Sequence, residues 1–73
     1  MREKLIDLIK SIAPAVELDD PDLNLAEDMD SIDIIALISE LEDEFDIEIT
    51  MEEKTEENFE NVDTLLKMIQ RLQ

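Results

Sequence analysis

The stretch DSIDIIALISELEDEF, residues 30–45, decides the fold of this 73-residue chain. Apolar residues recur along one side of a helix drawn through it and carboxylates occupy the other side, which predicts an amphipathic helix. We expect this helix to begin at Asp30 or Ser31, with Asp30 and Asp33 as a weak capping box, and to end at Asp46. Its expected core stripe consists of Ile34, Ile38, Leu41 and Phe45, with Leu37 adjacent.

Two more helices follow from the same periodicity. Residues 2–12 carry apolar side chains at helical spacing, and Pro14 ends this helix because the residue before a proline disfavours the helical region. Asn61 is the expected N-cap of the last helix, whose apolar positions run through residues 62–72. The chain therefore contains three substantial helices.

The connections between these helices are polar. The first, residues 15–29, is aperiodic, and loops of this length in small domains are usually functional or partly helical. Three leucines are expected to hold it on the core: Leu18, Leu23 and Leu25. Residues 47–50 alternate like a strand but have no partner, so we expect an extended connector that buries Ile47 or Ile49. Residues 51–59 leave room for one short helix.

The composition limits both the fold and the chemistry. One domain over residues 1–73 is expected, because a second core would not fit. We expect it to be all-α, a small bundle of three main helices plus one short helix, with a long first loop. The chain has no cysteine, so it can form neither a disulfide nor a thiolate metal site. It has no glycine either, so its turns must use Asn, Asp and Pro.

The charge is strongly uneven along the chain. The net charge of the chain is −16. Sixteen Asp and Glu residues, and no Lys or Arg, lie between Ser11 and Glu53, whereas the flanking residues carry no net charge. Such a field repels nucleic acid and anionic membranes and steers basic protein surfaces toward it. Charge also aids solubility, but segregation this complete favours a partner-facing surface. With no apolar signal core and no stretch near the roughly 20 residues of a membrane span, we expect a cytoplasmic protein.

The residue types argue against catalysis and against a calcium site. Without His or Cys in the chain, Ser31 lacks a general base, so an enzyme is not expected. An EF-hand frame that begins at Asp20 fails because position 6 is Leu25 instead of glycine and position 12 is Ser31 instead of a bidentate Glu. No specific metal site is expected.

Ser31 itself admits two interpretations. Serine is a favoured N-cap, so its hydroxyl could simply cap the helix that follows. Asp30 could cap instead, which would leave the Ser31 hydroxyl free for modification by another enzyme. The amide hydrogens and the positive dipole end of a helix N-terminus would favour a phosphate attached there.

The motif Asp30-Ser31-Ile32-Asp33, with the acidic cluster, the Phe and the Ile-containing connector in residues 42–49, resembles the acyl carrier proteins. In that family an Asp-Ser-Leu-Asp motif opens the second helix. Residues 58–65 also resemble the family's lead into its last helix. Length, helix order, acidity and the long first loop agree over nearly the whole chain.

The resemblance implies that Ser31 carries 4′-phosphopantetheine through a phosphodiester, whose terminal thiol holds acyl groups as thioesters. It implies a monomeric shuttle that does no chemistry itself and serves fatty-acid synthesis or a specialised acyl or polyketide pathway. Its partners would be a phosphopantetheinyl transferase and acyl-transferring or synthase enzymes with basic patches. The residues implied to meet those patches are Asp30, Ile32, Asp33, Glu42 and Asp43.

Several positions depart from the family pattern. Ala26-Glu27-Asp28-Met29 stands in place of the usual Leu-Gly pair, so we expect Asp28 to supply a left-handed turn. Ala36 and Ser39 stand where Glu and Met are common, which weakens the link to the standard fatty-acid synthase. Phe59 lies where it could narrow an acyl pocket, in a stretch longer than usual.

Two alternatives remain open from the sequence. Within the carrier class, the chain could be a D-alanyl or peptidyl-type carrier. From a different class, it could be an acidic helical adaptor or ion-buffering protein without a prosthetic group, in which Ser31 is merely a cap.

The uncompensated acidic segment generates a first prediction, on salt. Because sixteen carboxylates repel one another, the melting temperature should rise as NaCl is added from low ionic strength, and rise further with a divalent cation. Differential scanning calorimetry over a salt series measures this. A melting temperature that does not depend on salt would contradict it.

Overall fold

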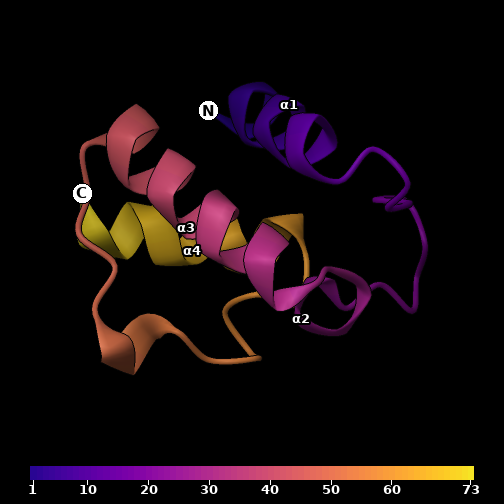
Figure 1. Ribbon diagram of the computed structural model, residues 1–73. Coiled ribbons are helices and arrows are strands. Elements are labelled where there is room, and N and C mark those ends of the chain that lie inside the picture. The colour runs from indigo at the N-terminus through magenta and orange to yellow at the C-terminus, as the bar shows by residue number, and fades with distance from the viewer.

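The computed structural model describes residues 1–73 as an all-helical protein, in agreement with the expected bundle (Figure 1). Three main helices form it, a short helix lies in the first loop, and the region predicted for one short helix holds only a 3₁₀ turn. The elements are α1 (Arg2–Ile12), α2 (Leu25–Asp28), α3 (Ser31–Phe45), the 3₁₀ turn η1 (Met51–Glu53) and α4 (Val62–Leu72). No helix combines the length and the apolar character that a membrane crossing requires.

The core is entirely apolar. Fifteen residues are buried, all of them hydrophobic, and no polar or charged side chain is buried with them. α1 packs against both α3 and α4, and Figure 1 shows α3 crossing in front of α4 with α1 above both. The fully buried side chains at the centre are Leu5, Ile9, Leu25, Leu37, Leu41, Leu65, Met68 and Ile69. Burial of apolar surface therefore holds the helices together.

The apolar face of α3 is centred on Leu37 and Leu41, which are completely buried. Leu37 was predicted only as adjacent to the stripe, whereas three predicted members of the stripe, Ile34, Ile38 and Phe45, are only partly buried. Ile34 and Ile38 lie on the side of α3 that lines a surface cleft, which explains why they keep contact with solvent.

The long first loop folds onto the core as expected. Leu23 and Leu25 are buried, and Leu18 packs partly against the core. The Asn24 side chain caps α2 by accepting from the Ala26 N–H at 3.1 Å. The N–H groups of Leu25 and Ala26 also donate, at 2.9 Å each, to the carbonyls of residues 60 and 59. These bonds join the first loop to the segment that precedes α4.

One residue, Asp46, provides the left-handed turn that a chain without glycine needs. It follows α3 with φ 52° and ψ 52° and is the one residue with positive φ. Its N–H donates to the carbonyl of Glu42, so the predicted end of the helix is confirmed. The prediction for Asp28 is wrong, because this residue ends α2 with helical geometry and the chain leaves α2 through an extended Met29.

The connector after α3 buries two side chains instead of one. Ile47 and Ile49 are both buried, while Glu48 between them is exposed, as in an extended chain with one face on the core. The room left for a short helix in residues 51–59 is filled only by η1, and turns occupy the rest.

Surface ion pairs join α1 to its neighbours. Arg2 binds Asp63 of α4, and the Lys4 Nζ lies 2.8 Å from a Glu44 oxygen of α3. The hydrogen bond and the positive charge of Arg2 hold the pKa of Asp63 below its ordinary value. A lowered pKa contributes stability above the unfolded pKa, and this contribution disappears as the pH falls through the folded pKa.

The start of α4 generates a prediction on stability. Asn61 and Thr64 form a reciprocal capping box, with the Asn61 Oδ1 accepting from the Thr64 N–H at 2.9 Å. Asn61→Ala should therefore lower the free energy of unfolding by roughly 1 kcal/mol in urea titrations. Asp30→Ala is the matched control, because Asp30 holds the N-cap position of α3 without a side-chain bond. Equal losses in the two variants would contradict the assignment.

Candidate functional site: the start of α3 and the adjoining cleft

Ser31 is the first residue of α3 and is exposed. Asp30 holds the N-cap position, but its side chain makes no cap hydrogen bond, so the predicted Asp30–Asp33 capping box is wrong. The interpretation of Ser31 as a plain cap is wrong as well, because its position is helical. The first backbone bond of the helix runs from the Ile34 N–H to the Asp30 carbonyl at 2.9 Å. The N–H groups of residues 31–33, at the start of the helix, therefore have no intrahelical acceptor.

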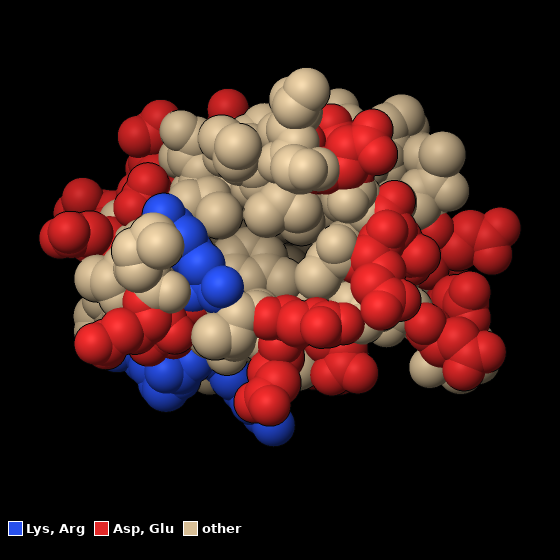
Figure 2. Space-filling view, turned by 60° about the horizontal axis from the view of Figure 1, so that its bottom comes forward, with Lys and Arg blue, Asp and Glu red and all other residues tan.

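A cleft of about 520 Å³ opens beside Ser31. Three isoleucines of α3 form one wall, and α2 with Met29 forms part of the rim. The opposite wall comes from the turns before α4. The lining residues are Ala26, Glu27, Met29, Ser31, Ile34, Ile35, Ile38, Lys54, Thr55, Glu56 and Phe59. Figure 2 shows a hollow among uncharged side chains, with basic and acidic side chains at its edges. The cleft thus has an apolar wall and a polar wall.

Phe59 is the buried aromatic residue of the polar wall. Its ring is buried, and it lines the cleft at the same time. The expectation that Phe59 lies where it would limit a pocket therefore agrees with its position.

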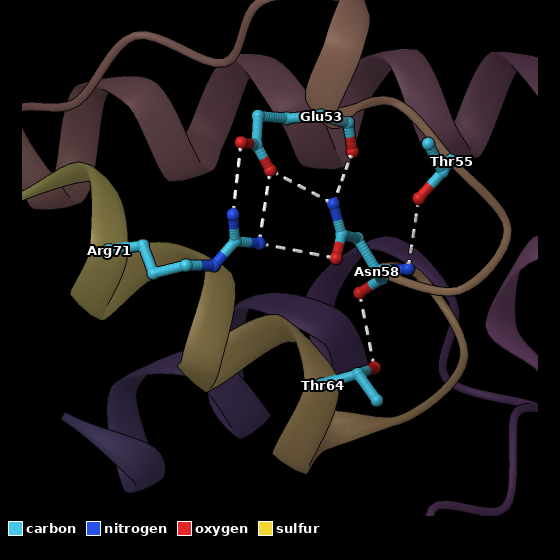
Figure 3. Close-up of polar contacts among 5 residues, drawn as sticks. All are labelled: Glu53, Thr55, Asn58, Thr64 and Arg71. Atoms are coloured by element: carbon cyan, nitrogen blue, oxygen red, sulfur yellow. Dashed lines mark hydrogen bonds and ion pairs between the residues drawn. The ribbon is translucent and has the colours of Figure 1, made fainter.

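A hydrogen-bond network holds the polar wall in place (Figure 3). The Arg71 guanidinium of α4 binds the Glu53 carboxylate through two nitrogens, each 3.0 Å from a carboxylate oxygen. One of these nitrogens also lies 3.3 Å from the Asn58 Oδ1. The Asn58 amide donates to the Glu53 backbone carbonyl at 2.8 Å and to its carboxylate at 3.0 Å. Residues 53 and 58 are thereby joined to each other and to α4.

Two hydroxyls complete this network. The Asn58 N–H donates to the Thr55 Oγ1 at 3.3 Å, and the Thr64 hydroxyl donates to the Asn58 carbonyl at 3.1 Å. The sequence did not signal this arrangement, because Arg71 and Glu53 are eighteen positions apart and belong to different elements. Only the three-dimensional fold brings them together.

Lys54 is the basic residue that the fold brings to the cleft of Ser31. In the sequence it lies just beyond the end of the acidic segment, so its proximity to Ser31 was not foreseen. Figure 2 shows Lys and Arg side chains to the left of and below the hollow, with carboxylates close to them. The surroundings of Ser31 are thus acidic with one nearby cation.

The predicted partner residues lie at the two ends of α3. Asp30 and Ile32 are exposed, Ile32 with 79% of its surface accessible, and Asp33 is half-buried beside them. Asp43 is exposed near the other end, about 15 Å beyond Asp33 along the helix axis. Glu42 is half-buried, because its Oε2 accepts from the Ile49 N–H at 2.9 Å.

Ile35 belongs to the same surface and was missed as a site residue. It is 67% exposed and also lines the cleft. Its i+3 spacing from Ile32 was the available signal, since residues at this spacing are neighbours on a helix surface. Ile32, Ile35, Ser39 and Asp43 therefore form one exposed stripe along α3.

The arrangement around Ser31 contains an accessible hydroxyl but no catalytic dyad or triad. The Ser31 hydroxyl is accessible, and the chain contains no His or Cys that could activate it. No group of three or more carboxylates is placed to hold a metal ion.

Comparison with known proteins gives one finding. The model of the family described as phosphopantetheine attachment site matches residues 3–72, nearly the whole chain. Neither the curated proteins nor the solved structures contain a match.

The two acidic residues at the end of α3 generate a prediction. Glu42→Ala should lower the free energy of unfolding by about 1 kcal/mol, because the Ile49 N–H loses a carboxylate acceptor. Asp43→Ala removes the same charge from an exposed position and should change it by less than about 0.5 kcal/mol. Urea unfolding of both variants measures the difference, and a loss for Asp43→Ala as large as for Glu42→Ala would refute it.

Proposed function

Because the chain belongs to the phosphopantetheine attachment-site family, which carries 4′-phosphopantetheine covalently, we propose that Ser31 is the residue that bears the group. Its Oγ would form the phosphodiester, and the terminal thiol would hold an acyl group as a thioester. A chain without cysteine thus obtains a reactive sulfur from its prosthetic group. The alternative of an adaptor without a prosthetic group has no support from the family.

The placement of Ser31 carries this proposal. It is the serine that is exposed at the open start of a helix and lines a cleft with an apolar wall. Ser11 lies within α1 and Ser39 lies in the middle of α3, and neither lines this cleft. A phosphate on Ser31 would sit next to backbone amides at the positive end of the α3 dipole.

The cleft supports a carrier of acyl groups. Its apolar wall, formed by Ile34, Ile35 and Ile38, offers a surface on which an acyl chain can lie out of water. We therefore propose a carrier that serves fatty-acid synthesis or a specialised acyl or polyketide pathway. A D-alanyl or peptidyl-type carrier is the second candidate, favoured by the polar opposite wall with Lys54 and Thr55.

We propose that enzymes with basic patches recognise the exposed surface of α3. Asp30, Ile32, Asp33 and Asp43 present carboxylates and one apolar side chain, with Ile35 as an addition from the structure. Glu42 would contribute with the oxygen that does not bind Ile49. Contacts of this type are fast and sensitive to salt, which suits a shuttle that visits a phosphopantetheinyl transferase and several acyl-handling enzymes.

Intact-mass spectrometry tests the attachment site. After co-expression with a phosphopantetheinyl transferase of broad specificity, the wild type should gain the mass of one 4′-phosphopantetheine group and Ser31→Ala should gain none. Ser39→Ala, which removes an exposed hydroxyl from the same helix, should be modified like the wild type. A wild type left unmodified by several transferases, or a modified Ser31→Ala, would overturn the proposal.

A further inference from the structure

The polar wall of the cleft carries Lys54, the one basic residue among those that line the cavity with Ser31. We propose that the Lys54 ammonium binds the phosphodiester that links 4′-phosphopantetheine to Ser31. This inference rests on the proposed attachment at Ser31 and adds the cation that offsets the charge of the attached group.

The backbone around Lys54 is fixed on both sides. Its own N–H donates to the Met51 carbonyl at 3.2 Å, and the next N–H, of Thr55, donates to the Glu53 carbonyl at 2.9 Å. The Thr55 carbonyl accepts from the Phe59 N–H at 3.2 Å. Because Phe59 is buried, this segment is joined to the core, and the base of the Lys54 side chain is held at the cleft.

Lys54 forms no ion pair, and two of the carboxylates close to it in sequence have partners of their own. Arg71 binds both carboxylate oxygens of Glu53. Glu56, which also lines the cleft, accepts a hydrogen bond from the Asn24 amide at 3.0 Å. The ion pairs of the protein involve Arg2, Lys4 and Arg71, and Lys54 takes part in none of them.

Because the surroundings of Ser31 are acidic, a cation at this place offsets charge repulsion on an attached phosphodiester. Asp30 and Asp33 flank Ser31 in the sequence, and Glu27 lines the same cleft, so a phosphodiester adds a negative charge to an already negative region. Lysine binds phosphate as a mobile point charge on a long stem, and exposed pairs of this kind contribute modestly and are weakened by salt. The Lys54 contact would therefore hold the prosthetic arm near the cleft without locking it there.

Differential labelling of lysines tests the contact in the intact protein. Apo protein and holo protein with a free thiol are treated with trace acetic anhydride, and mass spectrometry quantifies acetylation at each lysine. The phosphodiester is then the only anion that has been added. Lys54 should react roughly two- to fivefold more slowly in the holo protein, the range of an exposed ion pair. Lys67, an exposed lysine of α4 that does not line the cleft, should react equally in both forms.

The results of this experiment distinguish the attachment at Ser31 from the Lys54 contact. If no holo protein forms, the attachment at Ser31 fails and this inference fails with it. If holo protein forms but Lys54 is protected no more than Lys67, only the Lys54 contact is refuted. Protection that persists unchanged in 1 M NaCl would also refute an ion pair, because such a contact is screened at that ionic strength.

Phosphorus NMR provides a second measurement, and a variant tests the role of Arg71. In holo protein the ³¹P resonance should move in Lys54→Gln and stay in place in Lys67→Gln.

Arg71→Gln releases the Glu53 carboxylate next to Lys54. The variant should therefore slow Lys54 labelling already in the apo form and shrink the difference in labelling between the apo and holo forms. Arg2→Gln, which breaks an ion pair away from the cleft, should preserve that difference. A difference that is the same in Arg71→Gln as in the wild type would contradict the availability argued for Lys54.

Discussion

The contact of Arg71 with Glu53 and Asn58 is the interaction on which the candidate site depends (Figure 3). Residues 54–58 contain no helix and bury no side chain, so apolar packing cannot fix their path. Hydrogen bonds to α4 do so instead, and Phe59 joins the end of the segment to the core. The cleft beside Ser31 exists because this segment stands opposite the isoleucines of α3 as a polar wall.

The separation of apolar and charged groups explains how so acidic a chain folds. All fifteen buried residues are hydrophobic, so none of the carboxylates has to be desolvated in the core. Three of the bases are used in ion pairs that connect α1 with α3, α1 with α4 and η1 with α4. Exposed pairs of this kind add little stability. They leave most of the acidic surface uncompensated, which is the surface that we propose for basic partners.

Much of the fold could be predicted from the sequence, because helical periodicity and end signals report local preferences. The first helix, the end of the second at Asp46 and the N-cap at Asn61 are confirmed. The start of α3 at Ser31 is confirmed as well, but the Asp30–Asp33 capping box is wrong, because the Asp30 side chain makes no cap bond. The left-handed turn predicted at Asp28 is wrong because α2 extends through this residue.

The candidate site could be predicted only in part, because its residues meet through tertiary contacts. The motif identified Ser31, whereas the approach of Lys54 and the bond between Glu42 and the Ile49 N–H depend on how loops return to α3. The turns in residues 54–59 have no periodic pattern that a sequence reading could use. Their geometry depends on bonds to residues far away in the sequence, which include Arg71 and Thr64 of α4 and Asn24 of the first loop.

Backbone ¹⁵N relaxation of Arg71→Gln against the wild type tests most directly whether this contact holds the cleft wall. Order parameters should fall at residues 53–58 and remain unchanged in α1 and in the core of α3, because those helices are held by apolar packing. Lys67→Gln removes a charge from the same helix without touching the network and should leave residues 53–58 as ordered as in the wild type. Unchanged order parameters at residues 53–58 in Arg71→Gln would contradict the account.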